Sequence, residues 1–189
     1  MARKPEKSAM TRRRMVAGAS ALAAWLAVPS ARAQNASPLE PPARQFPVDL
    51  VVIDKRRRRL HLYHRDRIVR SYRIALGQNP VGHKRDRGDG RTPEGLYRID
   101  LKKPDSRFGL ALHLDYPNGR DRAQAAARGA DPGGQIYIHG QPREATELAY
   151  FRLKFAREDW TDGCIAVTNG EIAEIFRSVR EGTPVLVRP

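Results

Sequence analysis

The chemistry of this chain is expected to centre on Cys164, its single cysteine. Cys164 follows Gly163, and His139 lies upstream, at the end of the apolar run Ile136-Tyr137-Ile138. A thiol and an imidazole are the minimum equipment for acyl transfer through a thioester, because the imidazole can accept the thiol proton. A lone cysteine is otherwise most often a small buried apolar side chain. The rest of the sequence must therefore decide between a catalytic and a structural cysteine.

A helix is predicted to begin shortly after Cys164. It runs from about Gly170 to Val179, where apolar residues recur at i, i+3, i+4 and i+7, at Ile172, Ile175, Phe176 and Val179. Thr168 and Glu171 form a capping box at its start. The thiol is thereby placed on a glycine-containing turn near exposed backbone N–H groups, a setting that favours a thiolate and can hold an oxyanion.

The rest of the domain is predicted to be mostly antiparallel β structure. Short β-prone runs alternate with Gly, Pro and Asp, which is typical of strands joined by tight turns. The predicted strands are Val48–Ile53, Leu60–His64, Ile68–Leu76, Gly95–Leu101, Leu110–Asp115, Gln135–His139 and Pro184–Val187. A single cysteine allows no intrachain disulfide, so the hydrophobic core must hold the fold unaided.

The first 47 residues are expected to lie outside this domain. Residues 1–33 have the features of a cleavable export signal: paired arginines after Thr11, an apolar stretch from Met15 to Val28, and a small-residue cleavage site near Ala33. The basic start fits a twin-arginine signal or a general secretory signal. The apolar stretch is shorter than the about 20 residues that cross a bilayer, which argues against a stable membrane anchor after cleavage. Residues 34–47 are predicted to be a proline-rich linker, and the exported protein is expected in the periplasm.

The charge of the chain indicates an anionic partner. Its formal net charge is +14, and the densest basic cluster is residues 55–59, Lys-Arg-Arg-Arg-Arg. For an exported protein we expect no nucleic acid partner and favour an anionic cell wall or lipid surface. A solvated turn without any partner is the alternative for this cluster.

Several ordered motifs occur along residues 48–189. They are a hairpin from Val51 to Tyr63, Gly82-His83-Lys84, Gly88-Asp89-Gly90-Arg91-Thr92-Pro93-Glu94-Gly95-Leu96-Tyr97, Leu112-His113-Leu114-Asp115-Tyr116-Pro117-Asn118, Ile138-His139-Gly140 and Asp162-Gly163-Cys164-Ile165-Ala166-Val167-Thr168-Asn169. Together they resemble the YkuD-type L,D-transpeptidase catalytic domain, in its YafK-like branch. The resemblance implies a mostly β, sandwich-like or barrel-like domain over residues 48–189, with a helix following the catalytic cysteine. It implies no cofactor and no metal, and His61 and His64, on opposite faces of a strand, make a poor metal pair.

The resemblance also implies roles for the catalytic residues. Cys164 is expected to attack the carbonyl that joins the third residue of a peptidoglycan stem peptide, diaminopimelate, to the terminal D-alanine. His139 acts as general base and then general acid, oriented by the backbone carbonyl of Gly140, while the N–H groups of Gly163 and Cys164 hold the oxyanion. We expect the imidazole to keep the pKa of the thiol below its ordinary value of about 8.5.

Substrate binding is expected at six further residues: Thr161, Asp162, His83, Lys84, Tyr116 and Asn118. Among them, His83 and Lys84 are expected to contact a substrate carboxylate, and Tyr116 and Asn118 to border the cleft.

Two departures from the family pattern concern substrate handling. The pattern Ser/Thr-His-Gly-Cys is replaced by Thr161-Asp162-Gly163-Cys164, so the second histidine is absent, and Ala166 stands where the pattern has Arg or Asn. His139 and Cys164 are 25 residues apart, a longer spacing than is usual in the family, so a segment around residues 145–155 is expected to form a lid or wall.

Three functions remain open at this point. The first is an L,D-transpeptidase that forms 3-3 cross-links between stem peptides or attaches a protein to the wall. The second is an amidase or L,D-carboxypeptidase that uses the same site, because transfer and hydrolysis differ only in what reaches the thioester. The third is a non-catalytic module that binds the wall through its basic surface.

Overall fold

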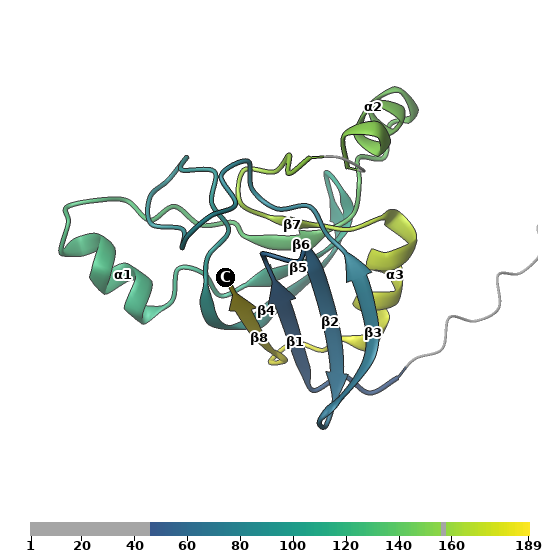
Figure 1. Ribbon diagram of the computed structural model, residues 1–189, viewed down its shortest axis with the longest axis horizontal. Coiled ribbons are helices and arrows are strands. Elements are labelled where there is room, and N and C mark those ends of the chain that lie inside the picture. The colour runs from purple at the N-terminus through teal and green to yellow at the C-terminus, as the bar shows by residue number, and fades with distance from the viewer. Residues whose placement is uncertain (1–45, 156–157) are drawn as a thin grey trace, which may run out of the picture. The chain divides into compact units, whose positions relative to one another are not determined.

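The computed structural model describes residues 46–155 and 158–189, and its eight strands form one open mixed sheet (Figure 1). The predicted export signal and residues 34–45 of the predicted linker lie outside the described residues. The strands are β1 (Leu50–Asp54), β2 (Arg59–His64), β3 (Arg67–Arg73), β4 (Gly95–Ser106), β5 (Gly109–Leu114), β6 (Tyr137–His139), β7 (Ile165–Ala166) and β8 (Pro184–Arg188). Their order in the sheet is β3-β2-β1-β8-β4-β5-β6-β7.

Most strand pairs are antiparallel, as predicted. The two parallel pairs are β1 with β8 and β6 with β7. The second of these pairs places His139 in register with Ala166, two residues beyond Cys164. Residues that are 25 positions apart in the chain are thereby brought to one edge of the sheet.

The core lies between the two halves of the sheet. β4 belongs to both halves, because it pairs with β8 through residues 95–98 and with β5 through residues 99–106. Val51 and Leu62 from one half and Leu112 and Ile138 from the other are fully buried in the same cluster. Each such side chain contributes about 1.5–3 kcal/mol of transfer free energy on burial. A mostly β domain, with its halves packed on a common core, is therefore confirmed.

The helix after the cysteine is also confirmed. It is α3 (Asn169–Ser178), and it buries Ile172 and Ile175 against the core. Its capping box is present: the Glu171 N–H donates to Thr168 Oγ1 at 3.3 Å, and the Thr168 N–H donates to Glu171 Oε2 at 2.8 Å.

Two further helices were not predicted. α1 (Gly119–Ala126) consists of polar residues and alanines and lacks a strong apolar stripe, and its main sequence signal is the capping box of Asn118 and Asp121. α2 (Ala145–Phe155) occupies the segment that was expected to form a lid or wall. β7 was missed as well, because two residues are too few to show an alternating pattern.

The basic cluster 55–59 is not one uniform anion-binding surface. Lys55 is buried, and its Nζ donates to Gly82 O, Thr92 O and Glu94 Oε1. Arg58 forms an ion pair with Asp159 at 2.6 Å. Two of the five charges therefore stabilise the domain internally, while the other three are exposed. No helix among residues 46–155 and 158–189 has the length and apolar character needed to cross a membrane.

Candidate active site

Cys164 ends a tight turn that begins at Thr161 and leads into β7. The Gly163 N–H donates to Thr161 Oγ1 at 3.1 Å, and the same hydroxyl donates to Cys164 O at 2.8 Å. Thr161, predicted to bind substrate, is buried and closes this turn. Gly163 has φ of +127°, and a Cβ there would lie 2.5 Å from Arg91 O, so both conformation and space require glycine.

His139 ends β6 and is 2% exposed. Its Nδ1 lies 2.6 Å from Gly140 O. Because a carbonyl oxygen only accepts, Nδ1 carries the proton and Nε2 is left as the basic nitrogen. The ring stacks on Phe108 with 4.3 Å between centroids and meets the Trp160 ring edge-on at 5.7 Å. These contacts fix the orientation of the imidazole.

Cys164 and His139 line one cavity of about 260 Å³. Phe108 and Tyr137 form aromatic walls, and Lys103 and Arg107 also line the cavity. The Cys164 thiol donates to the Gln135 carbonyl at 3.5 Å. Gln135 has φ of +59°, a left-handed conformation that is uncommon for a residue other than glycine. The fold therefore brings thiol and imidazole to one small, largely apolar space.

Both groups rest in their neutral forms in this structure. Burial lowers the pKa of His139 to about 4, although its hydrogen bond to Gly140 acts in the opposite direction. Burial also raises the pKa of the Cys164 thiol to about 11; Asp162 adds to this, whereas the Tyr137 N–H and Lys84 oppose it. The expectation of a thiol pKa below about 8.5 is therefore wrong for the unliganded protein. The apolar walls penalise both members of a thiolate–imidazolium pair, and α3 begins only at Asn169, with its first amides capped.

The amide groups near the sulfur differ from those expected. The Gly163 N–H, predicted to hold an oxyanion, is already bonded to Thr161 Oγ1. The backbone N–H of Tyr137 instead acts on the sulfur and lowers the pKa of Cys164. Tyr137 was not predicted as a functional residue. Its contact with the cysteine arises from the pairing of β6 with the segment around β7, which the sequence does not reveal.

Asp162 and Lys84 line a second cavity of about 470 Å³ beside the first, and Gln135 lines both. Lys84 is 3% exposed, and its Nζ donates to Asp86 O at 3.0 Å and to Asp89 Oδ1 at 2.8 Å. Asp162 is exposed and accepts a long hydrogen bond of 3.4 Å from Gln78 Nε2. Asp162 raises and Lys84 lowers the pKa of the Cys164 thiol, but neither lines the cavity that Cys164 shares with His139.

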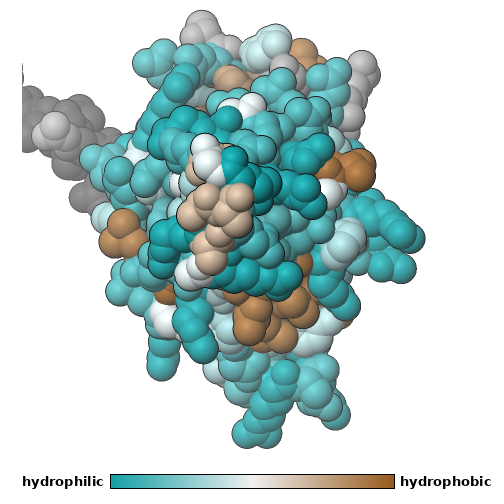
Figure 2. Space-filling view, turned by 90° about the vertical axis from the view of Figure 1, so that its left-hand side faces the viewer, coloured by the Kyte–Doolittle hydropathy of each residue, from teal (hydrophilic) through white to brown (hydrophobic). Residues whose placement is uncertain are grey.

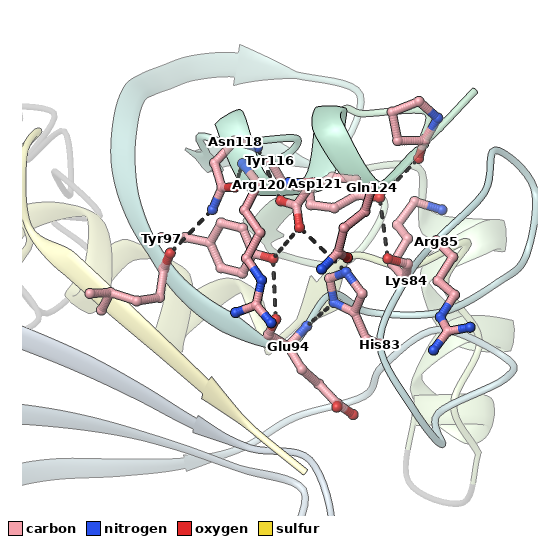
Figure 3. Close-up of polar contacts among 12 residues, drawn as sticks. His83, Lys84, Arg85, Glu94, Tyr97, Tyr116, Asn118, Arg120, Asp121 and Gln124 are labelled. Carbon is pink, nitrogen blue, oxygen red and sulfur yellow. Dashed lines mark hydrogen bonds and ion pairs between the residues drawn. The ribbon is translucent and has the colours of Figure 1, made fainter. Parts of the chain in front are cut away.

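The other predicted substrate residues lie apart from Cys164. Tyr116 is buried, and its hydroxyl donates to Pro132 O at 3.0 Å and to Lys84 O at 3.4 Å. Asn118 caps α1. His83 accepts a hydrogen bond from the Glu94 N–H at Nδ1 (Figure 3). His83 and Asn118 line a third cavity that shares no lining residue with the two beside Cys164.

Comparison with known proteins identifies the family of this site. The family model of the L,D-transpeptidase catalytic domain, YkuD, matches residues 48–187. The chain belongs to this L,D-transpeptidase family. YafK of Escherichia coli K12, named as an L,D-transpeptidase, is 31% identical over 135 residues, which cover 68% of this chain and 46% of YafK. YqjB of Bacillus subtilis is 26% identical over 142 residues, covering 72% of this chain and 69% of YqjB. The chain thus spans about half the length of YafK.

Two solved structures share the fold. The helical cell shape determining protein Pgp2 of Campylobacter jejuni matches with a TM-score of 0.59 and 27% identity, over 75% of this chain and 47% of Pgp2. An L,D-transpeptidase of Mycobacterium smegmatis matches with a TM-score of 0.50 and 16% identity, over 74% of this chain and 58% of that protein. The match to Pgp2 covers less than half of that protein. The match to the Mycobacterium smegmatis protein supports the fold alone, because the sequence identity is low.

The aromatic side chains that enclose His139 were not predicted from the sequence. Trp160 packs edge-on against Phe151 of α2, with 4.6 Å between centroids, and so links α2 to His139. Trp160 lies four residues before Cys164, and this closeness in the sequence could have indicated that it belongs to the site. Phe108 sits in the turn between β4 and β5 and offered none. Among the described residues, no group of His, Cys, Asp and Glu side chains has the arrangement of a metal site.

Proposed function

We propose that this L,D-transpeptidase acts on peptidoglycan stem peptides through an acyl-Cys164 intermediate, forming 3-3 cross-links or attaching a protein to the wall. The observation that carries this proposal is the shared cavity of Cys164 and His139, in which Nδ1 is held by Gly140 and Nε2 is left as the base. The similarity to Pgp2, named for cell shape, supports a role in wall shape. Residues 1–33 are proposed to export the domain to the periplasm.

The first half of the reaction begins from a neutral pair. As the substrate carbonyl approaches Sγ, His139 Nε2 takes the thiol proton and the sulfur–carbon bond forms. The imidazolium then gives the proton to the nitrogen of D-alanine, and the carbon–nitrogen bond breaks. The diaminopimelate acyl group remains on Cys164 as a thioester. Transfer of the proton during attack means that a stable thiolate is not required beforehand.

The developing oxyanion needs donors in the same space. We assign this role to the N–H groups of Cys164 and Tyr137, since Thr161 already occupies the N–H of Gly163. Loss of one such donor typically costs about 2.7–4 kcal/mol of transition-state stabilisation. Tyr137 thus replaces Gly163 in the assignment made from sequence.

The cavity beside the thiol is lined by charges of both signs. Lys84 and Arg87 are cations already paired with Asp89 and Asp131, and Asp162 is an exposed anion that can accept an ammonium group. D-alanine carries both groups once it has been released, and so does the free end of an acceptor diaminopimelate. We propose that the leaving amino acid departs through this cavity and that the acceptor amine attacks the thioester from it.

Hydrolysis is the second candidate at the same site. Asp162 is exposed beside the sulfur and replaces the histidine of the family pattern, so a different acceptor, water included, is supported by this position. The products separate the two: cross-linking adds a second stem, whereas hydrolysis adds only water.

The test is incubation of purified protein with disaccharide-tetrapeptide, followed by mass spectrometry. We expect D-alanine release from the wild type, with a dimer if transfer dominates and a tripeptide if hydrolysis dominates. Cys164→Ala is the matched control, because it removes only the sulfur. Equal release by wild type and Cys164→Ala would overturn the catalytic proposal.

The binding-module alternative is tested by pull-down on sacculi. It predicts retention that survives Cys164→Ser and weakens with salt, because charge pairing at an exposed surface is screened. Retention in this experiment together with no D-alanine release would favour the module over the enzyme.

A further inference from the structure

The segment after Gly82 separates the catalytic region from a third, larger cavity. Lys84 and Arg87 line the cavity beside Cys164, whereas His83 and Arg85 line the larger one, of about 680 Å³. Because consecutive residues face different spaces, this segment acts as a wall between them. The larger cavity lies between this segment, the N-terminal half of α1 and the ends of β4 and β8 (Figure 3). Its size is that of a site for a drug-sized ligand or a short peptide.

The acidic groups of this cavity already have partners within the protein. Glu94 Oε1 lies 2.7 Å from the ammonium group of Lys55. Asp121 Oδ2 accepts the Asn118 N–H at 3.0 Å, and Oδ1 lies 3.4 Å from His83 Nε2 (Figure 3). These contacts hold the floor of the cavity. Glu94 is neutralised by Lys55, whereas Asp121 keeps its charge and is held by hydrogen bonds, because burial lowers the pKa of His83.

The arginines at the mouth of the cavity differ from these carboxylates, which already have partners. Arg85 and Arg120 are exposed, and within the described part of the chain neither guanidinium group has an acceptor. They come from different elements, the segment after Gly82 and α1, and lie on either side of His83 (Figure 3). Arg188 adds a third cation, which also acts on Asp54. The cavity therefore offers at least two guanidinium forks, whose geometry matches that of carboxylates.

The remaining walls favour a peptide over a simple ion. Gln124 supplies a neutral donor and acceptor, whereas the Asn118 side chain is already engaged in capping α1, and Leu96, which is 61% exposed, supplies an apolar surface. The face of the molecule around α1 is otherwise largely hydrophilic (Figure 2). This combination of cations, an amide and an apolar side chain suits a peptide ligand that bears carboxylates and small side chains.

We propose that this cavity binds the carboxylates of a second peptidoglycan stem peptide, separate from the stem that reacts at Cys164. This inference rests on the proposed function, because it takes peptidoglycan as the substrate. A polymer held at two stems would be presented to the thiol at a raised effective concentration without any new contact at the reacting atoms.

Binding is tested with Cys164→Ala protein, which cannot turn over the ligand. Isothermal titration with disaccharide-tetrapeptide at low salt is expected to show one further site per chain in addition to binding at Cys164 and in the cavity beside it. In Arg85→Glu/Arg120→Glu the affinity of this further site is expected to fall at least about tenfold, as the loss of two charged hydrogen-bonding groups would allow. The matched control is Arg56→Glu/Arg67→Glu, which changes the net charge equally at exposed sites elsewhere. Equal loss in both double variants would overturn the proposal, as would unchanged binding in the first.

Competition with inorganic phosphate tests whether the cavity recognises a peptide or any small anion. Inorganic phosphate is expected to displace the second peptide only weakly, because it lacks the apolar and amide contacts. If phosphate binds the cavity as tightly as the peptide does, the cavity is a general anion site and the peptide assignment is wrong.

A rate comparison connects the cavity to the wall polymer. In otherwise wild-type protein, the ratio of D-alanine release from sacculi to release from soluble monomer is expected to fall about tenfold in Arg85→Glu/Arg120→Glu, through KM for sacculi. An unchanged ratio would overturn the proposal. Should the wild type release no D-alanine at all, the proposed function fails, but the titration still decides whether the cavity binds the peptide.

Discussion

The neutral forms of Cys164 and His139 have a direct consequence for the reactivity of Cys164. With a thiol pKa of about 11, the thiolate fraction at pH 7 is about 10⁻⁴, compared with about 3% for a free thiol of pKa about 8.5. The more basic thiolate is also the better nucleophile, by roughly tenfold over this pKa difference. Alkylation of Cys164 by iodoacetamide near neutral pH is therefore expected to be roughly 30-fold slower than that of a free thiol.

The assay is intact-mass measurement of alkylation between pH 6 and 11, with the unfolded protein as the free-thiol reference. Cys164 is the single cysteine, so every mass shift reports on it. We expect the rate to rise steadily with pH, without a plateau below pH 10. His139→Ala should leave the neutral-pH alkylation rate nearly unchanged but abolish D-alanine release, because His139 is needed only when the proton moves during attack. A plateau with an apparent pKa below about 8.5 that disappears in His139→Ala would refute the neutral-pair reasoning and restore the thiolate–imidazolium pair.

Three further predictions concern the same site. His139 has a pKa of about 4 in the folded protein against 6.5 for the free side chain, so the unfolded chain binds more protons between these two pH values. The free energy of unfolding should therefore fall by about 3 kcal/mol as the pH drops from 7 to 4. Denaturant titrations of His139→Gln should lack this pH-dependent loss of stability. Phe108→Ala should hydrate the imidazole and raise its pKa, which moves the acidic limb of the pH profile of kcat/KM upward from about pH 4; an unmoved limb would show that Phe108 does not desolvate His139. Gly163→Ala should cost at least about 1–3 kcal/mol from its φ of +127° alone, and more from the contact with Arg91 O; thermal unfolding within error of the wild type would contradict this reading of the turn, and Gly170→Ala, which has open space for a Cβ, is the control.

Local sequence patterns predicted the elements around the site well. α3 and its capping box followed from the spacing of its apolar residues and from Thr168 and Glu171, because these signals act within a few residues of one another. The predicted strands were found with shifted ends: β3 ends at Arg73 rather than Leu76, since the following segment turns away and bridges Ala75 to Ala166. α1 and β7 were missed, because neither carries enough apolar periodicity to be recognised.

The choice of Cys164 and His139 as candidate residues came from the sequence alone, through residue type, flanking glycines and ordered motifs. Their meeting in one cavity depends on the parallel pairing of β6 with β7, a contact across 25 residues. The charge state of the pair depends on Phe108, Trp160 and the other walls that exclude water, and this reversed the predicted direction of the thiol pKa. Desolvation is a property of the packed protein, so no pattern of neighbouring residues reports it.

The residues predicted to bind substrate also show what the sequence can and cannot reveal. His83 and Lys84 are adjacent in the chain and were expected to act together, yet they face different cavities. Asp162 lies beside the thiol as its position in the motif implied, whereas Asn118 caps a helix and Tyr116 is buried. The sequence by itself determined which side chains are available for the proposed chemistry, because that depends on residue type. Only the tertiary structure decided which residues share a cavity with the thiol, because that depends on the path of the backbone and on which side of it each side chain leaves.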